Sequence, residues 1–387
     1  LVVFLFVLNE NLRHILPEFI PAQKVIKLNW DKQVDQLIQQ GIDDGVFSGA
    51  TVLISKEGKI AYKQSFGYAV QYANARKKQF QKPLKTRNDT VYDIASLTKI
   101  FTAMAVMQLY EQGKIGLDQP VARYLPPFAT NGKENVTVRQ LLTHTSGLPS
   151  SLPLYWIKGA RAERVKSALE AKLINRSGTK VVYSDLGFIV LGELVAQVSG
   201  MSLDQYVQKR IAQPLVLTMT RYRPPANIKQ RIAATEWEEN PPRGLVWGEV
   251  HDENAWALHG VAGHAGLFST AEDLHKVALL FLKRGKSNGH EFFQPKTIEE
   301  MTSNQTKQIR GAQRGLGFEL NQEWYMGPFA KQGAFGHTGF TGTSVFISPQ
   351  KQLIVILLTN RVHPVRTGPN INPIRKKLAQ IAAGYVK

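Results

Sequence analysis

Ser96 and Lys99 stand three residues apart at the start of an apolar run that continues to Tyr110, a pattern that could activate a serine. Because residues three apart lie on one face of a helix, the Lys99 amine would reach the Ser96 hydroxyl. The first N–H groups of the helix and its positive end would also favour an alkoxide or oxyanion there. A serine hydroxyl is a weak nucleophile and needs such a base. The pair therefore predicts nucleophilic catalysis.

The spacing alone is not specific, because Ser-x-x-Lys occurs three times in the chain. The segment 177–180 contains a helix-weakening glycine, and the segment 348–351 contains a proline that marks a turn between two apolar runs. Only Ser96 opens a helix. The alternative for this pair is structural, with Ser96 as a helix cap and Lys99 as a solvated residue of the first turn.

Tyr183 precedes a second predicted helix that begins near Leu186, so its side chain could enter a cleft from a loop. A tyrosine held near a lysine loses its proton more readily and can serve as a general base. On its own, Tyr183 is better explained as a packed loop aromatic.

The segment 336–342, Gly-His-Thr-Gly-Phe-Thr-Gly, follows a predicted strand near the end of the chain. Its glycines would let a substrate approach the backbone closely, and N–H groups at the strand edge could hold an oxyanion or an extended peptide. A simple turn is the alternative for this segment alone.

Taken in this order, the three segments resemble the signature of the serine β-lactamase and penicillin-binding-protein superfamily. The resemblance is greatest to its branch of class C β-lactamases, D-Ala-D-Ala carboxypeptidases and esterases. The segments 141–149 and 263–274 are similar to the same branch, so the resemblance covers roughly residues 30 to 385.

The resemblance implies a role for each matching residue. Ser96 would be the acylated nucleophile, Lys99 its base partner, and Tyr183 the shuttle that carries a proton to the leaving group. The backbone N–H groups of Ser96 and Phe340 would form an oxyanion hole. The residues implied in substrate binding are Asp185, His337, Thr338 and Gly339.

Two positions depart from the usual family pattern. Asp185 stands where Asn is common, and its charge would hold Lys99 protonated and leave more of the base work to Tyr183. His337 replaces the lysine that usually binds the substrate carboxylate, and a neutral imidazole is a weaker anchor at pH 7. This favours an esterase, an amidase or a peptidase with altered substrate over a β-lactamase.

The segment 249–264 is rich in histidine and acidic residues. Wall-recycling amidases of the branch carry similar segments, so Asp252, Asn254 and His264 either line the pocket or hold the loop. The segment lacks the helix-spaced ligand pair of a zinc hydrolase, and we expect neither a metal nor another cofactor. His144 is expected to stabilise a turn without taking part in chemistry.

The pattern of apolar residues predicts an α/β (α+β) fold of the β-lactamase and transpeptidase type. Early strands at 50–55 and 59–66 and late strands near 315–320, 333–337, 343–347 and 353–359 would form one largely antiparallel sheet. A sheet lobe would comprise about 30–95 and 265–387, flanked by helices such as 30–42, 271–284 and 374–386. A mostly helical lobe, about 96–264, would be inserted between the two parts.

Composition limits the cellular setting and the partners. The formal charge of +18 predicts attraction to polyanions, and the basic segment 76–87 is either a solvated loop or a patch that contacts anionic membrane or wall polymer. Without a nucleic-acid motif, a nucleic-acid partner is not expected. The absence of cysteine excludes disulfides but leaves an oxidising compartment open.

Residues 1–8 are apolar throughout, and we expect 1–29 to be a truncated signal or anchor followed by a tether. A buried strand or a mis-set start are the alternatives. The protein would then act outside the cytoplasmic membrane, secreted or anchored at the bacterial cell surface.

The sequence thus predicts a serine hydrolase that forms an acyl-enzyme on Ser96 and acts on a small-molecule or peptidoglycan-derived substrate. A D-Ala-D-Ala carboxypeptidase or a muropeptide amidase is favoured. A β-lactamase or carboxylesterase is the alternative within the family, and a non-catalytic penicillin-binding or wall-fragment sensor is the alternative of another class.

We expect a fluorophosphonate probe to label the protein covalently, and Ser96→Ala to abolish the labelling because the probe reacts with an activated serine. Intact-mass spectrometry provides the measurement. Ser177→Ala, in another Ser-x-x-Lys segment, serves as the matched control and should label normally. Unchanged labelling of the Ser96→Ala variant would sink the assignment.

Overall fold

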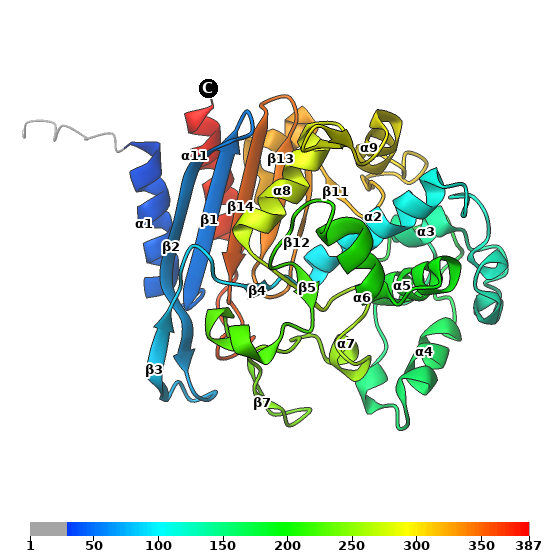
Figure 1. The fold of residues 1–387 in the computed structure, drawn as a ribbon, viewed down its shortest axis with the longest axis horizontal. Coiled ribbons are helices and arrows are strands. Elements are labelled where there is room, and N and C mark those ends of the chain that lie inside the picture. The colour runs from blue at the N-terminus through cyan, green and yellow to red at the C-terminus, as the bar shows by residue number, and fades with distance from the viewer. Residues whose placement is uncertain (1–28, 387) are drawn as a thin grey trace, which may run out of the picture.

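A seven-stranded antiparallel sheet joins the two ends of the chain in the computed structural model, which describes residues 29–386 (Figure 1). Its strand order is β11-β12-β13-β14-β1-β2-β3. The early strands are β1 (Gly49–Lys56), β2 (Lys59–Tyr72) and β3 (Gln79–Lys85); the late strands are β11 (Glu319–Leu320), β12 (Phe335–Thr338), β13 (Ser344–Ser348) and β14 (Leu353–Thr359). The pairing of β1 with β14 unites them, with Ala50 opposite Thr359.

The central strands are apolar because helices cover both faces of the sheet. Helix α8 (Ala271–Leu282) packs on one face, while α1 (Trp30–Asp43) and α11 (Asn372–Tyr385) pack together on the other. Alternate residues of a strand point to opposite faces. Accordingly, Leu53 joins the core on the α8 side, whereas Val52 and Ile54 join the core beneath α1 and α11.

The helical part of the chain lies beside this sheet and is built around α2 (Thr98–Glu111). Helix α2 is buried on almost every side from Thr98 to Met107, as its continuous apolar sequence predicts. The helices around it are α3 (Val138–Leu142), α4 (Arg161–Leu169), α5 (Asp185–Ser199) and α6 (Leu203–Tyr206).

Short elements connect the two parts. A three-stranded sheet has the order β4-β8-β5, formed by Tyr92–Asp93, Leu267–Ser269 and Arg221–Tyr222. The remaining pairs are β6 (Trp237–Glu238) with β7 (Gly244–Leu245) and β9 (Lys286–Ser287) with β10 (His290–Glu291), and the remaining helices are α7 (Glu253–Ala257), α9 (Pro295–Thr302) and α10 (Glu323–Met326). Because β4 leads directly to Ser96, this small sheet positions the start of α2.

The predicted antiparallel sheet from both ends of the chain is confirmed, but three local predictions differ. The basic segment 76–87 is not simply a loop, since β2 runs on to Tyr72 and offers an edge on which β3 forms. Strand β11 is shorter than predicted because Gly317 takes a positive φ of 79°. Within the predicted helical lobe, the helix that begins at Leu203 departs from regular α geometry and becomes π-helical from Val207.

The prediction for residues 1–28 lies outside the described residues. Within 29–386, no single helix is long and apolar enough to cross a bilayer. By length and composition alone, one pair bent by 73°, α5 with 203–212, would pass the same test.

Phe101→Ala should lower the free energy of unfolding by about 3–5 kcal/mol, because the ring is fully buried in the core around α2 and its loss leaves a cavity. Urea unfolding followed by circular dichroism provides the measurement. Phe101→Leu, which refills much of the space, should cost clearly less. Equal stability of the Ala variant and the unaltered protein would contradict this packing.

Candidate active site

Ser96 lies in a single 3₁₀ turn, Ala95–Leu97, that leads directly into α2. The preceding residue, Ala95, has a φ of 46°, which is strained for a residue with a side chain. Asp93 fixes this conformation, since its carboxylate accepts hydrogen bonds from the N–H of Ala95 at 2.8 Å and of His251 at 2.7 Å. The fold therefore holds the Ser96 backbone in a bend at the start of α2, the position predicted from the sequence.

Lys99 is fully buried one turn into the helix and connects three parts of the site. Its Nζ donates to the Ser96 hydroxyl at 2.9 Å and to the carbonyl oxygen of His264 at 3.1 Å. The same nitrogen lies 2.8 Å from a carboxylate oxygen of Asp185. The predicted contact between Ser96 and Lys99 is therefore present.

The surroundings of Lys99 keep it positively charged. Burial lowers its pKa, but the Asp185 carboxylate and Tyr183 outweigh burial and raise the pKa of Lys99 to about 12. At neutral pH the side chain is an ammonium ion, as expected from the aspartate at position 185. In this state Lys99 donates hydrogen bonds and stabilises negative charge, but it cannot accept the serine proton.

Tyr183 adjoins both Ser96 and Lys99. Its ring centre lies 4.8 Å from Nζ of Lys99, and interactions with Lys99 and Ser96 each lower the pKa of its hydroxyl. Burial raises the pKa of Tyr183 more than Lys99 lowers it, so the net direction is upward. Lys99 therefore eases loss of the Tyr183 proton, as expected, but burial outweighs this effect and Tyr183 carries its proton in the resting site.

His144 positions Tyr183 from behind. Its ring centre lies 4.5 Å from that of Tyr183, and its Nδ1 accepts a hydrogen bond from the N–H of Ser184 at 3.0 Å. Burial and the positive charge of Arg314 hold the pKa of His144 well below its ordinary value, so the ring is a neutral acceptor. This arrangement fits the structural role expected from the sequence.

His337, on β12, lines the cavity that contains Ser96. Its Nδ1 lies 2.7 Å from the carbonyl oxygen of Thr338, which can only accept, so Nδ1 carries the proton and Nε2 is an acceptor. Burial, followed by the Lys99 charge, lowers the pKa of His337 to about 3. The ring is neutral at pH 7 and supplies no charge for a substrate carboxylate.

The glycine after Thr338 is required by close packing. A Cβ at Gly339 would lie 2.1 Å from Oγ1 of Thr343 and 2.7 Å from the carbonyl oxygen of Ile94. The end of β12 can therefore approach the segment before Ser96 closely. Thr338, Gly339 and Phe340 all line the same cavity as Ser96 and Tyr183, so the predicted segments do meet.

The Ser96 cavity has a volume of about 510 Å³ and also contains three arginines that the sequence did not single out: Arg314, Arg361 and Arg375. Arg361 and Arg375 donate to backbone carbonyls of Phe340 and Gly339, each at 3.1 Å. Arg314 lies 3.3 Å from Glu319. They come from segments without a recognisable motif, and only the basic composition hinted at them.

The three residues predicted in the segment 249–264 lie outside the lining of the Ser96 cavity, and their side chains have other partners. Asp252 accepts from the N–H of Ala255 at 2.8 Å and lies 2.7 Å from Nε2 of His264. The amide of Asn254 donates to the carbonyl oxygen of Leu152 at 2.8 Å. These contacts correspond to the alternative in which the three side chains stabilise the loop 249–264. The loop in turn brings the His264 carbonyl oxygen to Lys99.

Among the described residues, Glu236, Glu238 and His251 form a buried cluster whose potential ligand atoms lie within 4.8 Å of one another. Guanidinium groups already neutralise it, because Arg366 contacts Glu236 at 2.5 Å and Arg243 contacts Glu238 at 3.0 Å. A metal cation would have to displace these positive charges, so the donor set fits an ion-pair network better than a metal site.

Comparison with known proteins agrees with this geometry. The profile of the beta-lactamase family matches residues 34–380. The chain is 35% identical to the "N-acetylmuramyl-L-alanine amidase" of Bacillus subtilis over 88% of this chain and 83% of that protein. It is 32% identical to the "Putative D-alanyl-D-alanine carboxypeptidase" of Escherichia coli K12, covering 93% and 88%.

A solved class C beta-lactamase superposes with a TM-score of 0.71 at 19% identity, covering 92% of this chain and 98% of that one. At this identity the likeness shows the fold alone. The predicted β-lactamase-like architecture is confirmed.

Asp185→Asn should move the alkaline limb of the kcat/KM profile to lower pH, by about 1–3 units. Asp185 raises the pKa of Lys99, so its neutralisation leaves burial to lower that pKa and the ammonium is lost earlier as pH rises. Hydrolysis of a chromogenic ester between pH 6 and 11 provides the measurement. Asp118→Asn removes a carboxylate that contacts Arg139 and is the control; an identical limb in all three proteins would refute the pairing.

Proposed function

The chain belongs to the beta-lactamase family, and on that premise we propose that this serine hydrolase cuts amide bonds of cell-wall muropeptides through an acyl-enzyme on Ser96. The observation that carries the proposal is the shared contact of the buried Lys99 ammonium with Ser96 and Asp185. This contact places a charged donor against the nucleophile, next to a protonated tyrosine.

The protonation states support a relay through Tyr183. Ser96 Oγ attacks the amide carbon while its proton moves to the Tyr183 oxygen. The Tyr183 proton passes to the leaving nitrogen, the C–N bond breaks, and an amine departs. Lys99 keeps its proton and stabilises the negative charge that develops on the two oxygens. The N–H groups of Ser96 and Phe340 would hold the carbonyl oxyanion.

Deacylation would run the same relay in reverse. Water attacks the acyl carbon and its proton reaches Ser96 Oγ through Tyr183, which releases a carboxylic acid. No cofactor takes part in these steps, because the chain's own side chains transfer the protons.

The amide that joins a muramyl group to L-alanine is the favoured substrate bond. The neutral His337 supplies no charge to anchor the terminal carboxylate of a D-Ala-D-Ala peptide. The relative from Bacillus subtilis is named for the muramyl amide. Cleavage of this bond requires only that the acyl group and the peptide lie on either side of Ser96.

A D-Ala-D-Ala carboxypeptidase is the second candidate. The three arginines of the Ser96 cavity support it, because a guanidinium binds a carboxylate by two parallel hydrogen bonds. Two of them already bind backbone carbonyls, which reduces their capacity for a substrate. The relative from Escherichia coli carries the corresponding name.

We place the reaction outside the cytoplasmic membrane, where wall peptides are found. The excess of positive charge, +18 for the whole chain, supports contact with anionic membrane lipids or wall polymers. Strand β3 and the turn before it present exposed basic side chains that would make this contact.

Incubation with four substrates followed by intact-mass analysis tests the proposal. The panel comprises N-acetylmuramyl-L-alanyl-D-isoglutamine, a peptide that ends in D-Ala-D-Ala, a chromogenic cephalosporin and a short-chain ester. We expect release of the dipeptide L-alanyl-D-isoglutamine from the first compound, with none from the Ser96→Ala variant. Turnover of the D-Ala-D-Ala peptide alone would replace the amidase by the carboxypeptidase, and binding without acylation would indicate a sensor.

Tyr183→Phe should reduce kcat on the muramyl amide by about 10²–10⁴-fold with little change in KM, because the ring remains but the proton relay is lost. Steady-state kinetics provides the measurement. Tyr155→Phe removes the hydroxyl of a tyrosine outside the Ser96 cavity and should leave kcat unchanged. A Tyr183→Phe variant with full activity would exclude the relay.

A further inference from the structure

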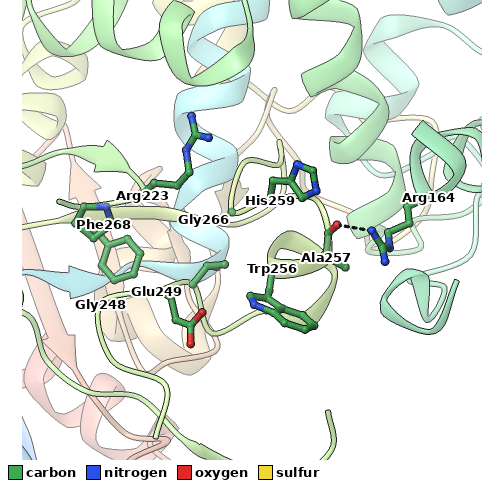
Figure 2. Close-up of a pocket in the computed structure, with 12 residues that line it drawn as sticks. Arg164, Arg223, Gly248, Glu249, Trp256, Ala257, His259, Gly266 and Phe268 are labelled. Carbon is green, nitrogen blue, oxygen red and sulfur yellow. Dashed lines mark hydrogen bonds between the residues drawn. The ribbon is translucent and has the colours of Figure 1, made fainter. Parts of the chain in front are cut away.

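A second cavity of about 490 Å³ shares no lining residue with the Ser96 cavity (Figure 2). Residues of α4, α7, β8 and the loops near them build it. Its lining includes Arg223, Glu249, Trp256, His259 and Phe268. Neither the relay at Ser96 nor the predicted substrate residues use this space.

The backbone around the second cavity is strained at two residues with side chains. Arg223 has a φ of 46° and His259 a φ of 61°, both in the left-handed region that ordinary residues rarely adopt. Such conformations cost free energy and persist only where the surroundings enforce them, and they gather at ligand sites. Here both residues contribute side chains to one cavity.

The chemistry of the lining fits a sugar ring. The Trp256 indole is 37% exposed, and the Arg243 guanidinium, which does not line the cavity, lies 4.9 Å from the ring centre and helps to fix it. Aromatic rings receive the apolar C–H face of a pyranose, while charged and imidazole side chains bind its hydroxyl edge. Arg223, which pairs with Asp204, and Glu249, which lies 3.7 Å from Arg243, supply both signs of charge. This balance suits a ligand with many hydroxyls better than a polyanion.

We propose that this second cavity binds a pyranose of the wall glycan, the sugar portion of the fragments that Ser96 acts on. The inference rests on the proposed function for the source of the sugar, while the cavity itself rests on its own geometry. The proposal thus names a sugar as the ligand of a cavity that is separate from the Ser96 cavity.

One strand connects the second cavity with the nucleophile. Gly266 and Phe268 line the cavity, and Leu267 between them holds the backbone around Ser96. The Leu267 carbonyl accepts from the N–H of Ile94 at 3.0 Å, and its N–H donates to Oγ1 of Thr98 at 3.2 Å. A sugar bound against β8 would therefore steady the bend that carries Ser96, so substrates that carry the sugar should acylate Ser96 faster than substrates without it.

Calorimetric titration of the full chain carrying Ser96→Ala tests the site, with N-acetylmuramic acid as one probe and the dipeptide L-alanyl-D-isoglutamine as the other. We expect the sugar to bind and Trp256→Ala to weaken its binding by about tenfold or more, as for aromatic anchors that become buried against a ligand. Trp156→Ala removes an exposed tryptophan outside the cavity and is the matched control, expected to bind like the parent. Glu249→Gln, a conservative change at a half-exposed side chain, should also weaken binding and guards against misfolding of the Trp256 variant.

Three outcomes would overturn the inference. The sugar does not bind, its binding is unaffected by both cavity variants, or only the dipeptide binds in this cavity. Cleavage of the muramyl amide is measured separately on the protein with Ser96 intact. If that amide is not cut while sugar binding still depends on Trp256, the proposed function fails and the sugar site stands.

Discussion

The buried ammonium of Lys99 is the interaction on which the rest of the site depends. A charge that is removed from water is tolerated only when partners compensate it, and here Asp185, the Ser96 hydroxyl and the His264 carbonyl do so. These partners come from three distant segments of the chain. The contacts that compensate the buried charge also bring Ser96, the segment with Tyr183 and the loop that ends at β8 together.

Because the ammonium is fixed, its neighbours divide the chemistry. Tyr183 keeps its proton and suits a relay, whereas His337 stays neutral and does not anchor a carboxylate. The segment 249–268 supports the site through its backbone. The His264 carbonyl contacts Lys99, and the His251 N–H contacts Asp93. The Leu267 N–H contacts Thr98, near Ser96. In the proposed mechanism, Lys99 and Tyr183 set the reaction type, and the Ser96 cavity and the second cavity set the choice of substrate.

The sequence predicted most of what is encoded locally. Ser96 and Lys99 are adjacent on one helix turn, and the apolar strands on either side of the sheet were visible as runs. It did not predict features that depend on long-range packing, such as Arg314 in the Ser96 cavity, which lies in no motif, or Trp256 in the second cavity, which lies in the singled-out segment 249–264 but was not itself named. Tyr183 was placed correctly, but its pKa depends on burial, which no local pattern reveals.

The central claim is that Lys99 is an ammonium ion with a raised pKa, and its titration tests this most directly. Nuclear magnetic resonance of the lysine side chains, with Lys99 assigned from a Lys99→Arg variant, would follow the Cε shift as pH rises. The account predicts that Lys99 remains protonated at pH 10.5, where an ordinary lysine is half titrated, in line with a pKa of about 12. A Lys99 that loses its proton at or below the pH of ordinary lysines would contradict it.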